Sequence, residues 1–170
     1  MYLQAPEKKM DYIWTPWRYQ YITKAVANEK QDCIFCDAAK RQDDAATLVV
    51  HRGVSSFAIL NRFPYTSGHL MIVPYKHIAE ISGLEAATLT EMMLLAQRVE
   101  AAFKSLYKPD GMNFGMNLGR AAGAGIAGHV HLHALPRWIG DASFMSVAAE
   151  TRVLPEDLAT TYDRLRAALA

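Results

Sequence analysis

The chain is poor in three features, each of which would point to a particular class of protein. It has only two cysteines among 170 residues, too few for the disulfide framework of a small secreted domain. Its net charge is +1, so it lacks the basic surplus of a general nucleic-acid binder. No apolar run approaches the roughly 20 residues that span a bilayer, and the N-terminus has no apolar signal segment. We therefore expect a cytoplasmic protein with no membrane and no nucleic-acid partner.

The composition is that of an ordinary globular domain, with 51% apolar and 21% charged side chains. The length predicts a single domain over residues 1–170, with residues 148–170 as a C-terminal extension. Residues 1–32 carry an aromatic cluster that predicts an N-terminal arm packed on the domain or on a neighbouring subunit. An aromatic wall for a nucleobase is the alternative for this cluster. Its members are Tyr12, Trp14, Trp17, Tyr19 and Tyr21.

The order of the predicted elements favours an α+β fold. Two β-rich runs meet at Gly53 and predict a hairpin, and a third run precedes one long apolar helical pattern. Two more strands and a last amphipathic helix follow. Such an order indicates an antiparallel sheet of about five strands, because a doubly wound parallel sheet needs repeated βα alternation. The predicted ranges are 47–52, 55–61, 69–74, 84–106, 112–118, 129–136 and 154–169.

Three histidines alternate with apolar residues in the segment 129–136, at His129, His131 and His133. On a strand, alternate side chains point to opposite faces, so the three imidazoles share one face. Imidazole is a nucleophile, a proton carrier and a metal ligand near neutral pH. Positions i to i+4 span about 13 Å, so the three cannot converge on one ion. A purely structural role is the alternative, but three protonated imidazoles on one face would repel one another.

Both cysteines lie in one C-x-x-C motif, Cys33 and Cys36. The polar segment before them does not resemble the buried strand of a thioredoxin-like redox unit. Two thiolates need two more ligands to complete a tetrahedral zinc site, and histidines are the natural supply. The motif by itself leaves zinc and two inert thiols both open.

A glycine-rich loop, residues 119–128, leads directly into the histidine segment. Glycines let backbone N–H groups approach an anion closely, and Arg120 adds a positive charge. A neutral imidazole attacks phosphorus without first losing a proton. The loop and the histidines together therefore indicate phosphate chemistry.

Further motifs along most of residues 12–147 accompany the histidines, and together they indicate which protein family the chain resembles. They read WTPWRYQYI, LNRFPYTSGHLMIVPYKH, GMNFGMNLGRAAG and HVHLHALPRWIGDASFM. With these blocks the chain resembles the histidine triad (HIT) superfamily of nucleotide hydrolases and transferases, and within it the bacterial diadenosine tetraphosphate phosphorylase and HIT hydrolase branch. The resemblance implies a HIT-like α+β meander whose sheets join across a homodimer.

The resemblance also implies roles for individual residues. His131 would be the nucleophile that forms a nucleotidyl-histidine intermediate, and His133 would contact the phosphate. Asn61 falls where the family contacts the ribose hydroxyls, although a turn residue is an equal alternative. Asn117 falls near the phosphates, with a strand-end hydrogen bond as its alternative. Gly125 would bind substrate through its backbone N–H.

A metal site follows from the same resemblance. Bacterial members with a C-x-x-C motif bind zinc through both cysteines, the histidine after the P-x-x-H turn, and the first triad histidine. Four protein ligands make a closed, structural site. His51 and His69 are left as structural residues. The implied ligands are Cys33, Cys36, His77 and His129.

The expected function is cleavage of dinucleoside polyphosphates, such as diadenosine tetraphosphate, at the α-phosphate. Phosphate as acceptor would make the chain a phosphorylase, and water would make it a hydrolase. Gly125 and Ile126 stand where family members usually carry a polar Gln or Ser that touches the phosphates or leaving group. That departure keeps two alternatives open: a nucleoside phosphoramidate hydrolase, and an adenine-nucleotide-binding partner protein with little turnover.

Overall fold

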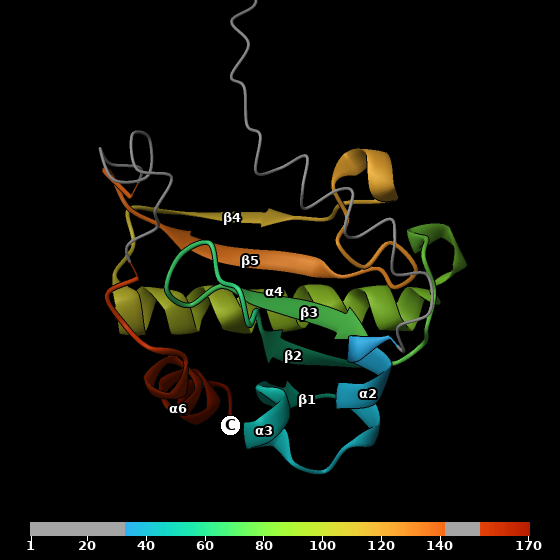
Figure 1. Ribbon diagram of the computed structural model, residues 1–170, viewed down its shortest axis with the longest axis horizontal. Helices are drawn as coiled ribbons and strands as arrows, with labels where there is room; N and C mark the ends of the chain where they lie inside the picture. The colour runs from blue at the N-terminus through green and yellow to red at the C-terminus, as the bar shows by residue number, and fades with distance from the viewer. Residues whose placement is uncertain (1–32, 142–153) are drawn as a thin grey trace, which may run out of the picture. The chain divides into compact units, whose positions relative to one another are not determined.

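A computed structural model describes residues 33–141 and 154–170, which contain one five-stranded antiparallel sheet (Figure 1). Its strand order is β1-β2-β3-β5-β4, as the α+β expectation of about five antiparallel strands required. The strands are β1 (Val49–Arg52), β2 (Ser56–Leu60), β3 (Leu70–Pro74), β4 (Gly111–Gly115) and β5 (Leu132–Arg137).

Parts of two predictions fall outside the described residues. The aromatic arm of residues 1–32 lies there, and so does the first part of the predicted C-terminal extension, up to residue 153. The single domain over residues 1–170 therefore stays a prediction.

Strand β5 lies between β3 and β4, and this pairing positions the histidines. Met71 of β3 and Gly115 of β4 are both opposite His133. Regular pairing begins only at Leu132, so the predicted strand start at His129 is wrong by three residues. The reason is that the backbone N–H of Val130 donates to the carbonyl of Ile78, 2.7 Å away, and not to β3.

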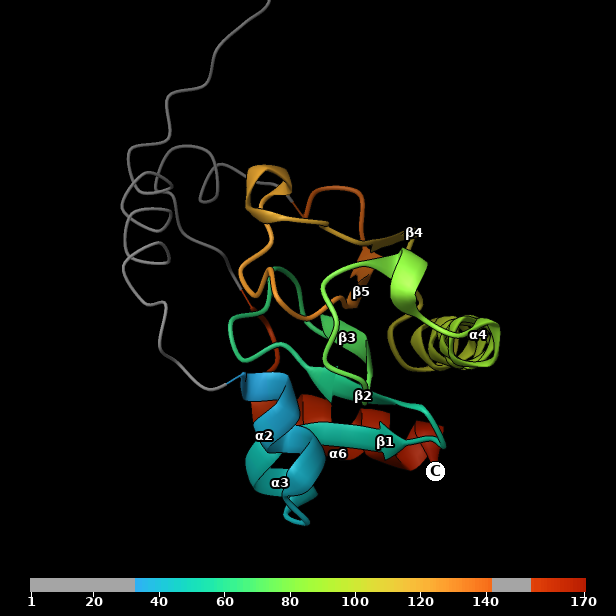
Figure 2. The ribbon, with the colours of Figure 1, turned by 90° about the vertical axis from the view of Figure 1, so that its right-hand side faces the viewer.

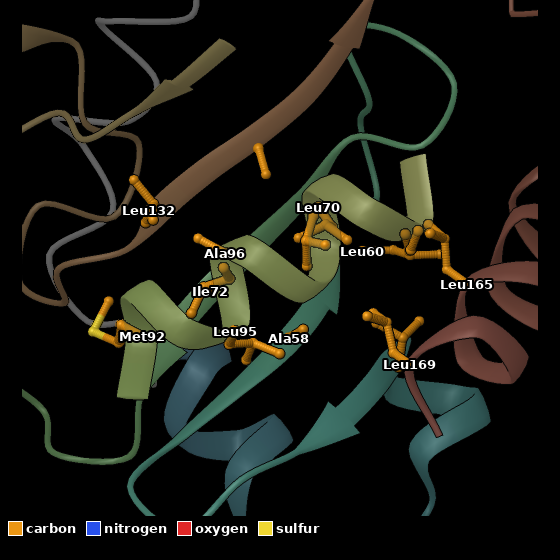
Figure 3. Close-up of a cluster of buried hydrophobic side chains, with 14 of the residues drawn as sticks. Ala58, Leu60, Leu70, Ile72, Met92, Leu95, Ala96, Leu132, Leu165 and Leu169 are labelled. Carbon is orange, nitrogen blue, oxygen red and sulfur yellow. The ribbon is translucent and has the colours of Figure 1, made fainter. Parts of the chain in front are cut away.

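The helices α4 (Ala86–Tyr107) and α6 (Leu158–Leu169) cover one face of the sheet. Figure 3 shows Met92, Leu95 and Ala96 of α4 directed at the strands, with α6 beside them. Burial of a side chain the size of Met92 or Leu95 contributes about 1.5–3 kcal/mol. Asp157 starts α6 by accepting a hydrogen bond from the N–H of Thr160, 2.8 Å away. None of the described helices is long and apolar enough to cross a bilayer.

Two short helices, α2 (Ile34–Lys40) and α3 (Asp44–Thr47), complete the N-terminal part of the described fold. Phe35 and Ala38 of α2 pack on the face of the sheet opposite to the face that α4 covers. Figure 2 shows α2 and α4 on opposite sides of the sheet. His133, opposite Met71, faces the α2 side. That second cluster consists of Phe35, Ala38, Val49, Phe57, Ile59, Met71 and Val73.

Candidate active site and metal centre

His129 is fully buried, and its two ring nitrogens face different partners. Its Nε2 lies 2.9 Å from the carbonyl oxygen of Pro74, which can only accept, so this nitrogen carries the proton. The lone pair of Nδ1 then points to the sulfurs of Cys33 at 3.3 Å and Cys36 at 3.7 Å. A neutral imidazole in this tautomer is ready to bind a metal ion.

Four side chains from three separate segments form a cluster with the donor set of a metal site. Cys33 and Cys36 lie one turn apart at the start of α2, His77 follows β3, and His129 precedes β5. Their donor atoms all lie within 4.8 Å of one another, and Nδ1 of His77 is 3.2 Å from the Cys36 sulfur. The four ligands expected from the sequence are thus brought together.

The chemistry of this cluster fits a bound cation. Burial, and then the neighbouring Cys33 thiol, raise the pKa of Cys36. Two thiolates this close to each other need a positive charge between them. Two sulfurs and two imidazole nitrogens make a four-ligand set with no position left for a substrate.

One ring nitrogen of His131, Nδ1, forms a hydrogen bond with the backbone, and the other, Nε2, does not take part in that bond. Its Nδ1 donates to the carbonyl of His129 at 2.8 Å, and a carbonyl can only accept. The lone pair of the neutral ring is therefore on Nε2. Burial lowers the pKa of His131, which favours this neutral form. A neutral imidazole held in a single tautomer is suited to nucleophilic attack.

His133 is oriented by His69, which lies just before β3. The backbone N–H of Tyr65 donates to Nδ1 of His69 at 3.2 Å, so the proton of His69 is on Nε2. That Nε2 donates to Nδ1 of His133 at 2.9 Å, which leaves the His133 proton on its own Nε2. Burial, and then the nearby His131, lower the pKa of His133 to about 4. The neutral ring can thus donate one hydrogen bond to a ligand.

The sequence interpretation missed His69 and left it as a structural residue. The side chain is 1% exposed and contacts His133 directly. The position of His69 at the start of a strand that pairs with the histidine segment would have indicated this contact. Only the tertiary structure shows that β3 pairs with β5. His51, the other unassigned histidine, accepts a hydrogen bond from Arg98 and takes no part in this arrangement.

Tyr65 forms an aromatic wall beside these two rings. Its ring centroid is 4.7 Å from that of His69 and 6.4 Å from that of His133, to which it is inclined by only 26°. Half of the side chain is exposed. The turn before β3 therefore places an aromatic face at the histidines.

Asn61 has the turn role that the sequence left open. Its Oδ1 accepts from the backbone N–H of Phe63 at 3.0 Å, and its Nδ2 donates to His69 at 3.3 Å. Asn117 lies two residues beyond the end of β4, so the predicted strand to residue 118 is too long. Within residues 33–141 and 154–170, no hydrogen bond joins Asn117 or Gly125 to the histidines.

The glycine-rich loop contains two positions that need glycine for backbone reasons. Gly119 and Gly123 have φ angles of 79° and 88°, and the second ends a short 3-10 turn. Ile126, which stands where a polar residue was expected, packs against the apolar cluster that contains Phe35. Its side chain therefore supports the core on this face of the sheet.

Comparison with known proteins identifies the family of the chain. A family model of the HIT domain matches residues 42–138. The AP-4-A phosphorylase of Mycobacterium tuberculosis (strain H37Rv) is 35% identical over 158 residues, which is 90% of this chain and 81% of that protein. The bis(5'-adenosyl)-triphosphatase of Dictyostelium discoideum is 32% identical over 82 residues, or 48% of this chain and 54% of that enzyme.

Solved structures show the same fold. A Zn-bound histidine triad family protein from Mycobacterium smegmatis superimposes with a TM-score of 0.64 at 29% identity, over 81% of this chain and 93% of that one. A hypothetical histidine triad nucleotide-binding protein from Sulfolobus tokodaii gives 0.62 at 25% identity, over 81% and 91%. The chain therefore belongs to the histidine triad (HIT) family.

Proposed function

We propose that this chain cleaves dinucleoside polyphosphates through a covalent intermediate on His131. The observation that carries the proposal is the hydrogen bond from His131 Nδ1 to the His129 carbonyl, which leaves a neutral nucleophilic Nε2. The similarity to an AP-4-A phosphorylase and to a bis(5'-adenosyl)-triphosphatase supports this substrate class.

In the first step, Nε2 of His131 attacks the α-phosphorus while the bond to the leaving polyphosphate oxygen breaks. The lone pair of Nε2 forms the new P–N bond, and the positive charge on the ring is stabilised by the hydrogen bond to the His129 carbonyl. In the second step, an oxygen of phosphate or water attacks the same phosphorus while the P–N bond breaks and its electron pair returns to Nε2, which releases His131 as a neutral ring. When water is the acceptor, its proton passes to the solvent. The nucleotide leaves with the acceptor oxygen.

His133 contacts the phosphate through its Nε2–H in both steps. His69 supports it, because the hydrogen bond between the two rings keeps the His133 proton on the nitrogen that faces away from His69. His69 is therefore a positioning residue. Asn61 steadies His69 and is the proposed contact to the ribose, while Asn117 and the backbone of Gly125 are proposed phosphate contacts.

Zinc is the proposed occupant of the four-ligand cluster. The Cys₂His₂ donor set is one that tetrahedral Zn²⁺ takes, and the similarity to a Zn-bound histidine triad protein supports the same ion here. When bound, the ion supplies a cross-link between α2 and the sheet. Free thiols as ligands also suit a reducing compartment, and we propose a cytoplasmic location.

A homodimer is the proposed assembly, joined at the edge of the sheet. Strand β4 ends the strand order, so within the described residues one of its edges has no neighbour. Phe114 on this strand is 39% exposed. Sedimentation of the protein with Phe114→Asp tests this: a dimer that is lost in this variant supports the β4 edge, and an unchanged dimer excludes it.

One panel of reactions identifies both the preferred substrate and the acceptor, phosphate or water. The purified protein is incubated with diadenosine tetraphosphate, diadenosine triphosphate and adenosine phosphoramidate, each with and without phosphate, and the products are identified by mass. ADP formed only with phosphate identifies a phosphorylase, whereas AMP formed without it identifies a hydrolase. Faster turnover of adenosine phosphoramidate than of either dinucleoside polyphosphate would contradict the proposal and indicate a nucleoside phosphoramidate hydrolase. Nucleotide binding without any product would indicate the partner protein.

A further inference from the structure

We propose that Phe35 is a positioning residue for the nucleophile, and that the Cys/His cluster holds Phe35 in place. The inference rests on the proposed function of His131 and deepens it. The Cys/His cluster then affects the rate of the chemical step in addition to stabilising the fold.

Phe35 contacts both histidines that matter to this arrangement. Its side chain is 0% exposed. Its ring centroid is 5.0 Å from that of His131, at a tilt of 51°, and 5.4 Å from that of His129, in an edge-to-face arrangement. One apolar ring therefore limits the rotation of the nucleophile and of the metal-ligand histidine beside it.

The position of Phe35 depends on the first turn of α2. Phe35 lies between Cys33 and Cys36, whose sulfurs face His129 and His77. Among residues 33–141 and 154–170, no side-chain hydrogen bond caps the start of this helix. Contacts between the cysteine sulfurs and the two imidazoles therefore tie this turn to the sheet.

The other end of α2 is held independently of those contacts. The guanidinium of Arg52 donates to the carbonyls of Ala38 and Ala39 at 2.9 and 3.1 Å. Asp44 accepts from the same side chain at 2.8 Å. Loss of the contacts between the cysteines and the imidazoles should therefore loosen the first turn, with Phe35, while the rest of the helix and the sheet stay folded.

His129 connects the cluster to the nucleophile a second time. Its Nδ1 faces the two sulfurs, while its carbonyl accepts the hydrogen bond of His131 at 2.8 Å. A displacement of His129 thus moves the group that sets the His131 tautomer. A misplacement of about 1 Å at a reacting group costs about 10²-fold in rate.

Phe35→Leu tests the contact directly, with Phe57→Leu as the matched control. Phe57 lies in the same apolar cluster and is also 0% exposed, but its ring stacks on Tyr75. We expect Phe35→Leu to lower kcat by about 10²-fold with less than about twofold change in KM, and Phe57→Leu to leave both near the unaltered values. Equal kinetics for the two variants would overturn the proposal.

Removal of the metal provides the second measurement, read by the ¹⁵N signals of the His131 ring. We expect chelation to give a mixture of His131 tautomers and a slower single turnover, and one equivalent of zinc to restore both. An unchanged His131 signal and rate in the metal-free protein would exclude the control by the cluster. If His131→Ala keeps its turnover, the proposed function fails instead. In that case the ¹⁵N signals of the His131 ring still test the positioning role of Phe35, and an unchanged His131 tautomer in Phe35→Leu overturns that role.

Discussion

His69 and His133, 64 residues apart in the sequence, share a hydrogen bond of 2.9 Å between Nε2 of the first and Nδ1 of the second. The bond exists because β3 and β5 are neighbours in the sheet, with Met71 opposite His133. It assigns the proton of His133 to Nε2, the nitrogen that faces away from His69.

Substitution of His69 by Ala should lower kcat by about 10²-fold, since His133 then loses its fixed tautomer and orientation. His69→Gln should recover part of the rate, because its amide can still donate to Nδ1 of His133. The matched control is His51→Gln, which changes a histidine bonded to Arg98. Steady-state kinetics on the preferred substrate would contradict the role if His69→Ala and His51→Gln behaved alike.

Substitution of His131 by Ala should lower kcat by at least about 10³-fold, as expected when a covalent nucleophile is removed. The variant should still bind the nucleotide, because the neighbouring His133 and the loop remain. Mass spectrometry of rapidly quenched unaltered protein should show one nucleotidyl group on His131, absent from the variant. Near-normal turnover by the variant would remove His131 from the mechanism.

The low pKa of His133 predicts a dependence of stability on pH. In the folded protein the pKa is about 4, against an ordinary value of 6.5, so the unfolded chain takes up the proton first as the pH falls. The free energy of unfolding from this group is therefore full above pH 6.5 and declines from there toward pH 4. Urea unfolding at a series of pH values should show a shallower decline for His133→Gln. Identical declines would show that folding does not favour the neutral form of His133.

Glu91 of α4 anchors the β1–β2 hairpin. Its carboxylate accepts hydrogen bonds from the backbone N–H and hydroxyl groups of Ser55 and Ser56, at 2.8–3.0 Å. Burial alone would raise the pKa of Glu91, but the hydrogen bonds from Ser55 and Ser56 lower it overall. Glu91→Gln should therefore reduce the free energy of unfolding by about 1.5–3 kcal/mol, because bonds to a charged acceptor are lost.

The control for Glu91 is Glu100→Gln on the same helix. The Glu100 side chain is 45% exposed, and its ion pair among the described residues is with Lys104 one turn later, so a change below about 0.5 kcal/mol is expected. Denaturant unfolding compares the two variants directly. Equal effects would show that the hairpin contact of Glu91 adds no stability beyond that of a surface ion pair.

Metal analysis tests the Cys/His cluster. Protein purified without added zinc should contain about one equivalent of zinc per chain, as a closed four-ligand site requires. Cys36→Ser should lose it, since the Cys36 sulfur is a donor atom of the cluster. His51→Ala, which changes a histidine outside the cluster, should retain it. A metal-free unaltered protein would contradict the assignment.

The local patterns of this sequence were sufficient to predict the class of fold and the pairing of two thiols on one helical turn. Alternation over 129–136 depends only on the geometry of an extended chain, so it placed apolar Leu132 and Ala134 on the core side correctly. The C-x-x-C spacing puts two thiols on one side of a helical turn for the same local reason. The histidine partners of those thiols came from the resemblance to the family.

Relationships across the sheet were not accessible in this way. The bond from His69 to His133, the approach of Phe35 to His131 and the late start of β5 each depend on which distant segments lie side by side. A repeat of two or 3.6 residues reports which face a side chain occupies, but it does not report what lies against that face. The sequence by itself therefore determined the face that each alternating side chain occupies, because that depends on local geometry alone. The tertiary structure decided the histidine tautomers and the residues that support them, because these depend on which distant segments pack together.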